Sequence, residues 1–129
     1  MGELVAGKTN ISLISPISEK ITGIVKSDNS GYWVIVHGWN NNEFYFFDIN
    51  CNGVNPTPLV YQIGNVHTGG TDNVNAVGYL KANIEGNKLA LVNRNVTGIE
   101  TFDFDSATGE GRGTKMNEYL IEKEFKYET

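Results

Sequence analysis

The stretch that decides the fold is Lys20–Gly53, KITGIVKSDNSGYWVIVHGWNNNEFYFFDINCNG, because a version of it recurs later in the chain. Shifted by 55 residues, it aligns without a gap with Asn75–Thr108, NAVGYLKANIEGNKLALVNRNVTGIETFDFDSAT. Six of the 34 aligned positions are identical: Gly23/Gly78, Lys26/Lys81, Gly31/Gly86, Asn40/Asn95, Phe47/Phe102 and Asp48/Asp103. Apolar positions such as Val34 and Leu89 also correspond. The alignment predicts an internal repeat of three consecutive strands, with a fourth strand before the next copy.

Short apolar runs of strand length alternate with turns along most of the chain. Nearly every gap between them holds Gly, Asn, Asp or Pro, the residues that collect at tight turns. The runs are Asn10–Ser15, Ile21–Lys26, Tyr32–His37, Phe44–Ile49, Leu59–Ile63, Val74–Lys81, Lys88–Val92 and Ile99–Phe104. This pattern predicts an all-β fold of antiparallel sheets. In Glu43–Ile49 both faces are largely apolar, as expected of a strand whose sheet is packed between two neighbours.

Composition limits the classes of protein to consider. With 129 residues the chain is long enough for one small domain. Its net charge of −5 argues against binding nucleic acid or an anionic membrane surface. No apolar stretch approaches the roughly 20 residues that span a bilayer, and we expect no signal peptide in this chain. Cys51 is the only cysteine, which excludes an internal disulfide and a cysteine zinc cluster.

The stretch from Asn10 to Gly109 resembles the propeller repeats of secreted or surface-attached proteins of Bacteroidetes bacteria, many of which carry a type IX secretion sorting domain. The resemblance rests on four stretches: Ile11–Thr22, Tyr32–Trp39 (YWVIVHGW), Phe44–Asn55 with its Asn-Gly turn, and Gly78–Asp105 followed by SATG. The last is similar to the blade pattern of seven-bladed, lactonase-like, YVTN and WD40-like propellers, although Asn83–Gly86 lacks the proline of the usual turn. The resemblance implies four-stranded antiparallel blades and an extracellular or cell-surface location. It is nearly silent on function, because propellers host unrelated activities.

A repeat of 55 residues divides the chain into two units and a tail. Residues 1–113 form the propeller-like segment, with repeats at about 20–74 and 75–113, and residues 114–129 form a charged tail or the start of a further strand. Propellers have typically 4–8 blades. Two blades make an incomplete ring with exposed apolar sheet faces. We therefore expect either self-association or further blades in a longer parent chain.

Four residues are candidates for ligand binding: His37, Trp39, Asn40 and His67. His37 and Trp39 lie two positions apart at a strand end, so their side chains share a face that could bind a sugar or a peptide. The alternative is that Trp39 packs against a neighbouring blade and His37 hydrogen-bonds a turn. His67, in a glycine-rich loop, could pair with Asp72. A metal site is not expected, because zinc needs three or four convergent ligands and the chain holds two histidines.

Other chemical motifs are incomplete, and we assign no catalytic residue, cofactor or metal. Asp48 and Asp103 are equivalent carboxylates, but in different blades we expect each to cap its own turn rather than form a glycosidase pair. The Asp103–Asp105 stretch lacks the spacing of an EF-hand loop. Cys51 has no adjacent histidine and is expected in a turn. Gly109–Gly113 lacks the Lys-Ser/Thr ending of a phosphate-binding loop.

These observations favour a non-enzymatic propeller segment of a bacterial surface or secreted protein, used for scaffolding or for recognition of a protein or carbohydrate ligand through loops on one rim. One alternative is a fragment of a lactonase- or glycosidase-like propeller enzyme whose active site needs further blades. Another is a structural subunit that assembles through open sheet edges. Convergent acidic or histidine side chains around a channel would favour the enzyme, and an aromatic-lined rim would favour recognition.

Overall fold

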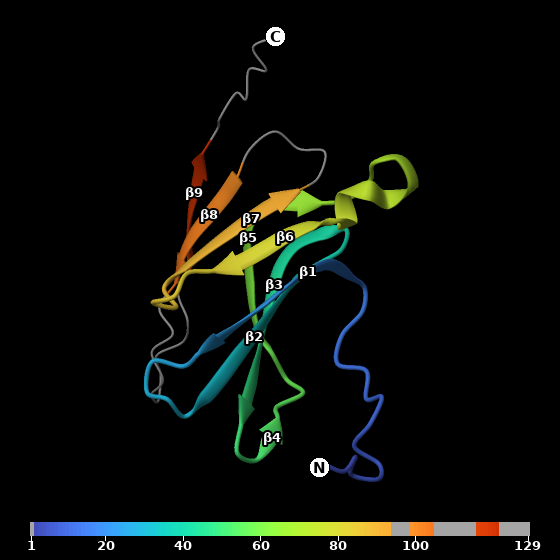
Figure 1. Cartoon of the computed structure of the whole chain (residues 1–129). Coiled ribbons are helices and arrows are strands. Elements are labelled where there is room, and N and C mark those ends of the chain that lie inside the picture. The colour runs from blue at the N-terminus through green and yellow to red at the C-terminus, as the bar shows by residue number, and fades with distance from the viewer. Residues whose placement is uncertain (1, 94–98, 105–115, 122–129) are drawn as a thin grey trace.

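A computed structural model places residues 2–93, 99–104 and 116–121, and these residues are described below. They form two antiparallel sheets and one short 3-10 helix (Figure 1). The elements are β1 Ile17–Val25, β2 Gly31–Gly38, β3 Asn41–Asn50, β4 Gly53–Val54, β5 Leu59–His67, η1 Thr71–Ala76, β6 Gly78–Ala82, β7 Lys88–Asn93, β8 Ile99–Phe104 and β9 Met116–Ile121. The predicted all-β fold is confirmed, whereas no closed sheet is present among these residues.

Each sheet is built from strands that neighbour one another in the sequence. The first sheet has the order β1-β2-β3-β5, with the two-residue β4 paired to the end of β3. The second has the order β6-β7-β8-β9. Each half of the chain therefore contributes three consecutive strands and a fourth, which is the arrangement that the sequence repeat predicts. No helix in the described part of the chain is long and apolar enough to cross a membrane.

The central strand β3 shows why the first sheet must be covered on both faces. Phe44 and Phe46 are fully buried on the face toward the second sheet, and Tyr45 and Phe47 are buried on the opposite face. Successive side chains of a strand point to opposite faces, so a run of four aromatic residues makes both faces apolar. The prediction that both faces of Glu43–Ile49 are packed is thus confirmed for these four side chains.

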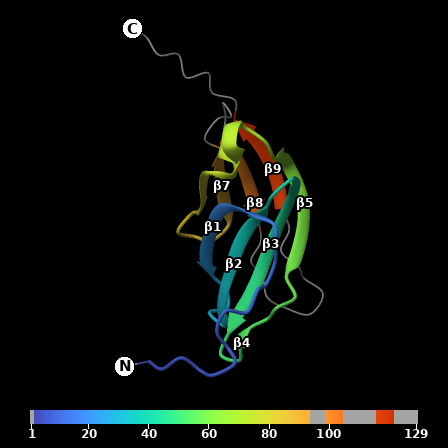
Figure 2. The same cartoon turned by 90° about the vertical axis from the view of Figure 1, so that its right-hand side faces the viewer.

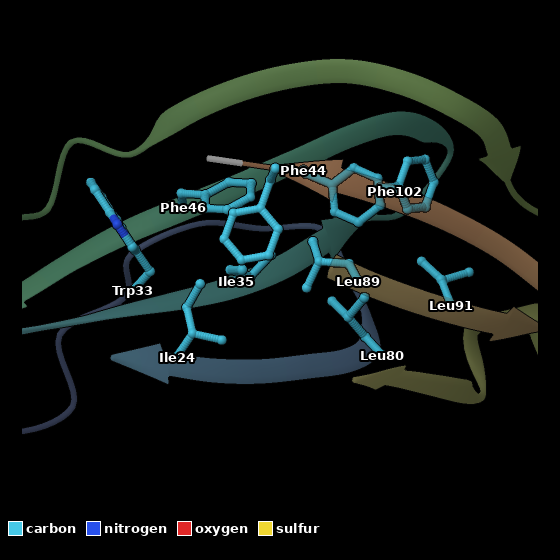
Figure 3. Packing of buried hydrophobic residues seen from close by; sticks show 10 residues of the cluster. Ile24, Trp33, Ile35, Phe44, Phe46, Leu80, Leu89, Leu91 and Phe102 are labelled. Carbon is cyan, nitrogen blue, oxygen red and sulfur yellow. The ribbon is translucent and has the colours of Figure 1, made fainter. Parts of the chain in front are cut away.

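The interior between the two sheets is a single cluster of aliphatic and aromatic side chains (Figure 3). Phe44 packs edge-on against Phe102, with ring centroids 5.0 Å apart, and Phe46 lies 6.1 Å from Phe104. Ile35 and Leu89 fill the centre of this layer. Burial of such side chains stabilises the fold by about 1.5–3 kcal/mol each, so the interface between the sheets supplies much of the apolar burial of the chain.

The two sheets stack in the same orientation. β1 lies against β6, and β5 lies against β9, so the first and fourth strands of one sheet face the first and fourth strands of the other. The buried residues with which the second sheet faces the first include Leu89, Leu91, Phe102 and Phe104. Their counterparts in the repeat are Val34, Val36, Phe47 and Ile49, and these line a groove on the outer face of the first sheet. The second sheet therefore packs on the first with the face whose counterpart in the first sheet points away from the interface.

The segment before β1 lies on that outer face, opposite the second sheet (Figure 2). Ile14 packs against the buried cluster of Val36, Tyr45 and Phe47. The strand predicted at Asn10–Ser15 is wrong, because this segment covers side chains instead of pairing its backbone with a neighbouring strand. The strand predicted at Val74–Lys81 is also partly wrong, since its first residues belong to η1 and β6 begins at Gly78.

The C-terminal region is described only in part. β9 lies within residues 114–129, predicted as a charged tail or the start of a further strand, and it pairs with β8 from Ile99–Ile121 to Phe104–Met116. Asn95, Asp105 and the loop Gly109–Gly113 lie outside the described residues.

Two equivalent glycines provide a matched test of the packing. A methyl group at Gly78 would overlap the carbonyl oxygen of Val92 and approach Lys20 Cε to 2.7 Å, whereas one at Gly23 would meet only Trp33 O at 3.8 Å. We expect Gly78→Ala to lower the free energy of unfolding by about 3 kcal/mol, because the backbone must move. Gly23→Ala should change it by less than about 1 kcal/mol. Urea unfolding followed by circular dichroism measures both, and equal effects would contradict the packing described here.

Candidate functional site

Four ionisable side chains meet between the two sheets, near one end of the interface. They are Lys20 from β1, His37 from β2, His67 from β5 and Glu100 from β8, and together they are called the buried polar cluster. None of the four is more than 5 % exposed. Buried charges are stable only when they are paired and hydrogen-bonded, so their partners decide what this cluster does.

A chain of hydrogen bonds runs through His67. Lys20 Nζ lies 3.2 Å from His67 Nδ1 and donates to Asn75 O at 2.9 Å. His67 Nε2 lies 3.1 Å from Glu100 Oε2. An ammonium group only donates, so Nδ1 of His67 accepts and Nε2 carries the proton that is donated to the carboxylate. In this arrangement Lys20 is the cation, Glu100 is the anion, and a neutral His67 connects them.

The other contacts hold both ends of this chain. The amide of Asn65 donates to Glu100 Oε1 at 2.7 Å, and Gly64 makes room for that carboxylate, since an added Cβ would lie 2.8 Å from Oε1. His37 stacks on His67 with ring centroids 3.7 Å apart, and its Nδ1 donates to Gly38 O at 2.7 Å. The side chains thus tie β1, β2, β5, β8 and the helix η1 together.

Burial shifts the protonation of the cluster. Burial, and then the neighbouring His67, lower the pKa of His37 to about 4, so His37 is neutral at pH 7. Burial likewise lowers the pKa of Lys20 to about 8, although the charge of Glu100 acts in the opposite direction. For Glu100, burial raises the pKa, but the hydrogen bonds from His67 and the Asn65 amide outweigh it and leave the pKa below its usual value. At pH 7 these shifts leave Lys20 charged and Glu100 ionised on the two sides of the His67 ring.

The structure brings together three of the four residues that the sequence singled out. His37 and His67 are stacked within the cluster, and Asn40 donates its backbone N–H to His67 O at 2.8 Å. Thr68 Oγ1 donates to Asn40 Oδ1 at 2.6 Å, so the β2–β3 turn and the segment after β5 are joined. His37 bonds the backbone of Gly38, the last residue of β2, which lies next to the turn of the predicted alternative, whereas packing of Trp39 against a neighbouring blade stays a prediction. The proposed pairing of His67 with Asp72 is wrong, because His67 faces Glu100 and Lys20.

Trp39 is half-buried and lies in the turn between β2 and β3, where its backbone N–H donates to Pro16 O at 3.2 Å. Asn40 beside it is exposed and has a positive φ of 65°, a conformation that asparagine tolerates better than most residues. Trp39, Asn40 and Thr68 are called the rim from here on.

The equivalent aspartates have a different role from the one predicted. Asp48 Oδ1 pairs with Lys26 Nζ at 2.5 Å, and Asp103 Oδ1 pairs with Lys88 Nζ at 2.5 Å. Each carboxylate therefore binds a lysine across its own sheet, and turn capping is not its main contact. The Lys26 ammonium also lies 4.5 Å above the Trp33 ring, a cation–π contact at the margin of the interface. Cys51 is exposed in a turn, as predicted.

Lys20, Glu100 and Gly64 were missed by the sequence reasoning, although one signal pointed to Glu100. It shares a strand face with Phe102 and Phe104, so a carboxylate on that face must be buried and needs a partner. Lys20 lies before the first residue assigned to its strand and gave no such signal.

The fold and the site define an all-β protein of two stacked antiparallel sheets with an enclosed Lys–His–Glu network. No group of three or more His, Cys, Asp or Glu side chains within residues 2–93, 99–104 and 116–121 is arranged to hold a metal ion. No protein-family model, curated protein or solved structure matches the chain.

The buried polar cluster predicts that stability falls as the pH is lowered through the weakly acidic range. His37 takes up a proton near pH 6.5 when unfolded but only near pH 4 when folded. The unfolded state therefore binds more protons between these values, and the free energy of unfolding falls by up to about 3 kcal/mol from pH 6.5 to pH 4. Glu100, whose pKa is lowered, acts in the same direction. Urea unfolding at several pH values measures this slope. His37→Phe should flatten it, and an unchanged slope in that variant would contradict the assignment.

Proposed function

We propose that this chain is a non-enzymatic segment of a stacked-sheet, propeller-like protein, which serves as a scaffold and presents a recognition surface outside a bacterial cell. The observation that carries the proposal is the orientation of the stack. The second sheet packs on the first with the face that corresponds, in the repeat, to the outer face of the first. Such packing can continue in one direction, as in arrays of repeated modules whose stability comes from contacts between neighbours.

The character of the buried polar cluster supports a non-enzymatic role. A catalytic acid or base must come within hydrogen-bond reach of a substrate, whereas Lys20, His37, His67 and Glu100 are enclosed between the sheets. Their hydrogen bonds run to one another and to the backbone. The cluster therefore acts in positioning the two sheets and the rim above them.

The rim is the surface that we propose for recognition. Trp39 offers an apolar ring and Asn40 an exposed carboxamide, a combination suited to a sugar or an extended peptide. Both belong to a turn whose backbone is fixed by bonds to Pro16 and His67. A rigid, preorganised aromatic side chain loses little entropy on binding. The secreted or surface location rests on the family resemblance of Tyr32–Trp39 and Gly78–Asp105.

Binding to a panel of soluble polysaccharides and extended peptides tests this function, with microscale thermophoresis as the measurement. We expect Trp39→Ala and Asn40→Ala to weaken a bound member of the panel by roughly tenfold or more, because each removes a direct contact at the rim. Ile84→Ala, in an exposed turn at 98 % exposure, is the matched control and should leave binding unchanged. Binding that is insensitive to both rim variants would contradict the rim. Hydrolysis of aryl glycosides or lactones that is lost in Glu100→Gln would favour the enzyme alternative.

A further inference from the structure

The outer face of the first sheet carries an apolar groove. Its lining includes Ile14, Ile21, Val34, Val36, Phe47 and Ile49. Ile21 is 61 % exposed, and Ile11, which also lines the groove, is 60 % exposed, whereas Val36 and Phe47 at its base are buried. Contiguous apolar surface of this kind marks a site of interaction. The segment before β1 covers only part of it.

The contact between the two sheets of one chain indicates what packs in this groove. Within one molecule, the inner face of the first sheet packs against four residues of the second sheet: Leu89, Leu91, Phe102 and Phe104. The groove is lined by the residues that correspond to them in the repeat: Val34, Val36, Phe47 and Ile49. We propose that the groove receives the outer face of the second sheet of another copy of this chain, and so continues the stack from copy to copy. This inference rests on the proposed scaffold function and names the partner.

The outer face of the second sheet has the matching residues. In the repeat, the inner-face residues Ile24, Ile35, Phe44 and Phe46 correspond to Tyr79, Ala90, Ile99 and Thr101. Tyr79 is 73 % exposed, and the other three are partly exposed. This face is smaller and less apolar than its counterpart, so the contact between copies is weaker than the contact within one copy.

Charge on this face does not oppose docking. Lys88 and Asp103 form an ion pair on the outer face of the second sheet. The corresponding margin of the internal interface already holds a lysine–aspartate pair, Lys26 and Asp48, with the Lys26 side chain 6 % exposed. An ion pair is therefore compatible with this kind of interface when both charges stay partnered.

The contact is heterologous, because two different faces meet. Contacts of this type close into a ring or continue as a filament. Closed rings of stacked sheets hold 4–8 sheets, so roughly two to four copies of a two-sheet chain complete one. The segment before β1 borders the groove, and the incoming sheet packs on its exposed side chains together with those of the first sheet.

Crosslinking between two single-cysteine variants tests the orientation of the contact. In a Cys51→Ser background, one variant carries Ile49→Cys in the groove and the other carries Thr101→Cys on the outer face of the second sheet. These positions correspond to Phe104 and Phe46, whose rings lie 6.1 Å apart within the chain. When the mixture is treated with a bismaleimide reagent that spans about 10 Å, the spacing of sheets packed face to face, we expect the mixed dimer to exceed either homodimer by roughly tenfold. Statistical amounts of the three dimers, or an excess of the Ile49→Cys homodimer, would overturn the proposal.

The mass in solution, measured by light scattering over a concentration series, provides the second readout. We expect the wild-type mass to rise with concentration and Ile21→Glu to remain a monomer, because the substitution places a charge in the groove. Ile84→Glu, in a turn away from the groove, is the matched control and should behave like the wild type. Circular dichroism confirms that both variants fold, which is expected since both isoleucines are mostly exposed. A wild-type monomer at every concentration overturns docking by a second copy, whereas binding at the rim is measured on the monomer and is judged separately.

Discussion

The structure depends on one constraint, which is that strand β3 is apolar on both of its faces. Phe44 and Phe46 cannot be buried by the same neighbour as Tyr45 and Phe47, since alternate side chains of a strand point in opposite directions. The chain meets this requirement with the second sheet on one side and the segment before β1 on the other. A single sheet with one solvated face would leave two of these aromatic rings in water, at a cost of about 1.5–3 kcal/mol each.

The buried polar cluster adds specificity to an interface that apolar packing alone would leave free to slide. Phenylalanine and leucine side chains tolerate several offsets between two sheets, but Lys20, His67 and Glu100 form their hydrogen bonds at one offset only. Separating Glu100 from its partners would leave a buried charge uncompensated, which costs more than the pair contributes when it is formed. The cluster therefore acts against incorrect stacking, and its position under the rim fixes the β2–β3 turn through the backbone of His67.

The sequence was a good guide to local structure and a poor guide to long-range polar contacts. The repeat placed the strands at Tyr32–His37, Lys88–Val92 and Ile99–Phe104 correctly, because alternation and turn residues are local signals. It failed at Val74–Lys81, where the positive φ values of Asp72 and Asn73 close a 3-10 turn before β6 can begin. The apolar residues of Val74–Lys81 predicted one strand, whereas the backbone conformation of the preceding residues delays the start of β6 to Gly78.

The candidate site shows the same division. His37 and His67 were selected from their positions at strand ends and in a loop, and the structure stacks them, but as buried partners rather than as ligand contacts. Their partners come from β1 and β8, on two different sheets. Contacts between side chains of two sheets depend on how one sheet is positioned over the other, and no local sequence pattern encodes that position. Only the strand face of Glu100 indicated that a charged group would be enclosed.

The difference between the inner face of the first sheet and the outer face of the second follows from substitutions within the repeat. Where the inner face of the first sheet has Trp33, Ile35 and Phe46, the outer face of the second has Lys88, Ala90 and Thr101. These changes replace large apolar groups by smaller or charged ones, while Asp48 and Asp103 stay the same and each keeps a lysine partner. The second sheet can therefore end a stack in water, yet it retains the shape and polarity of a face that packs. For the association between copies that we propose, a face of this intermediate character gives a contact that forms mainly at high local concentration.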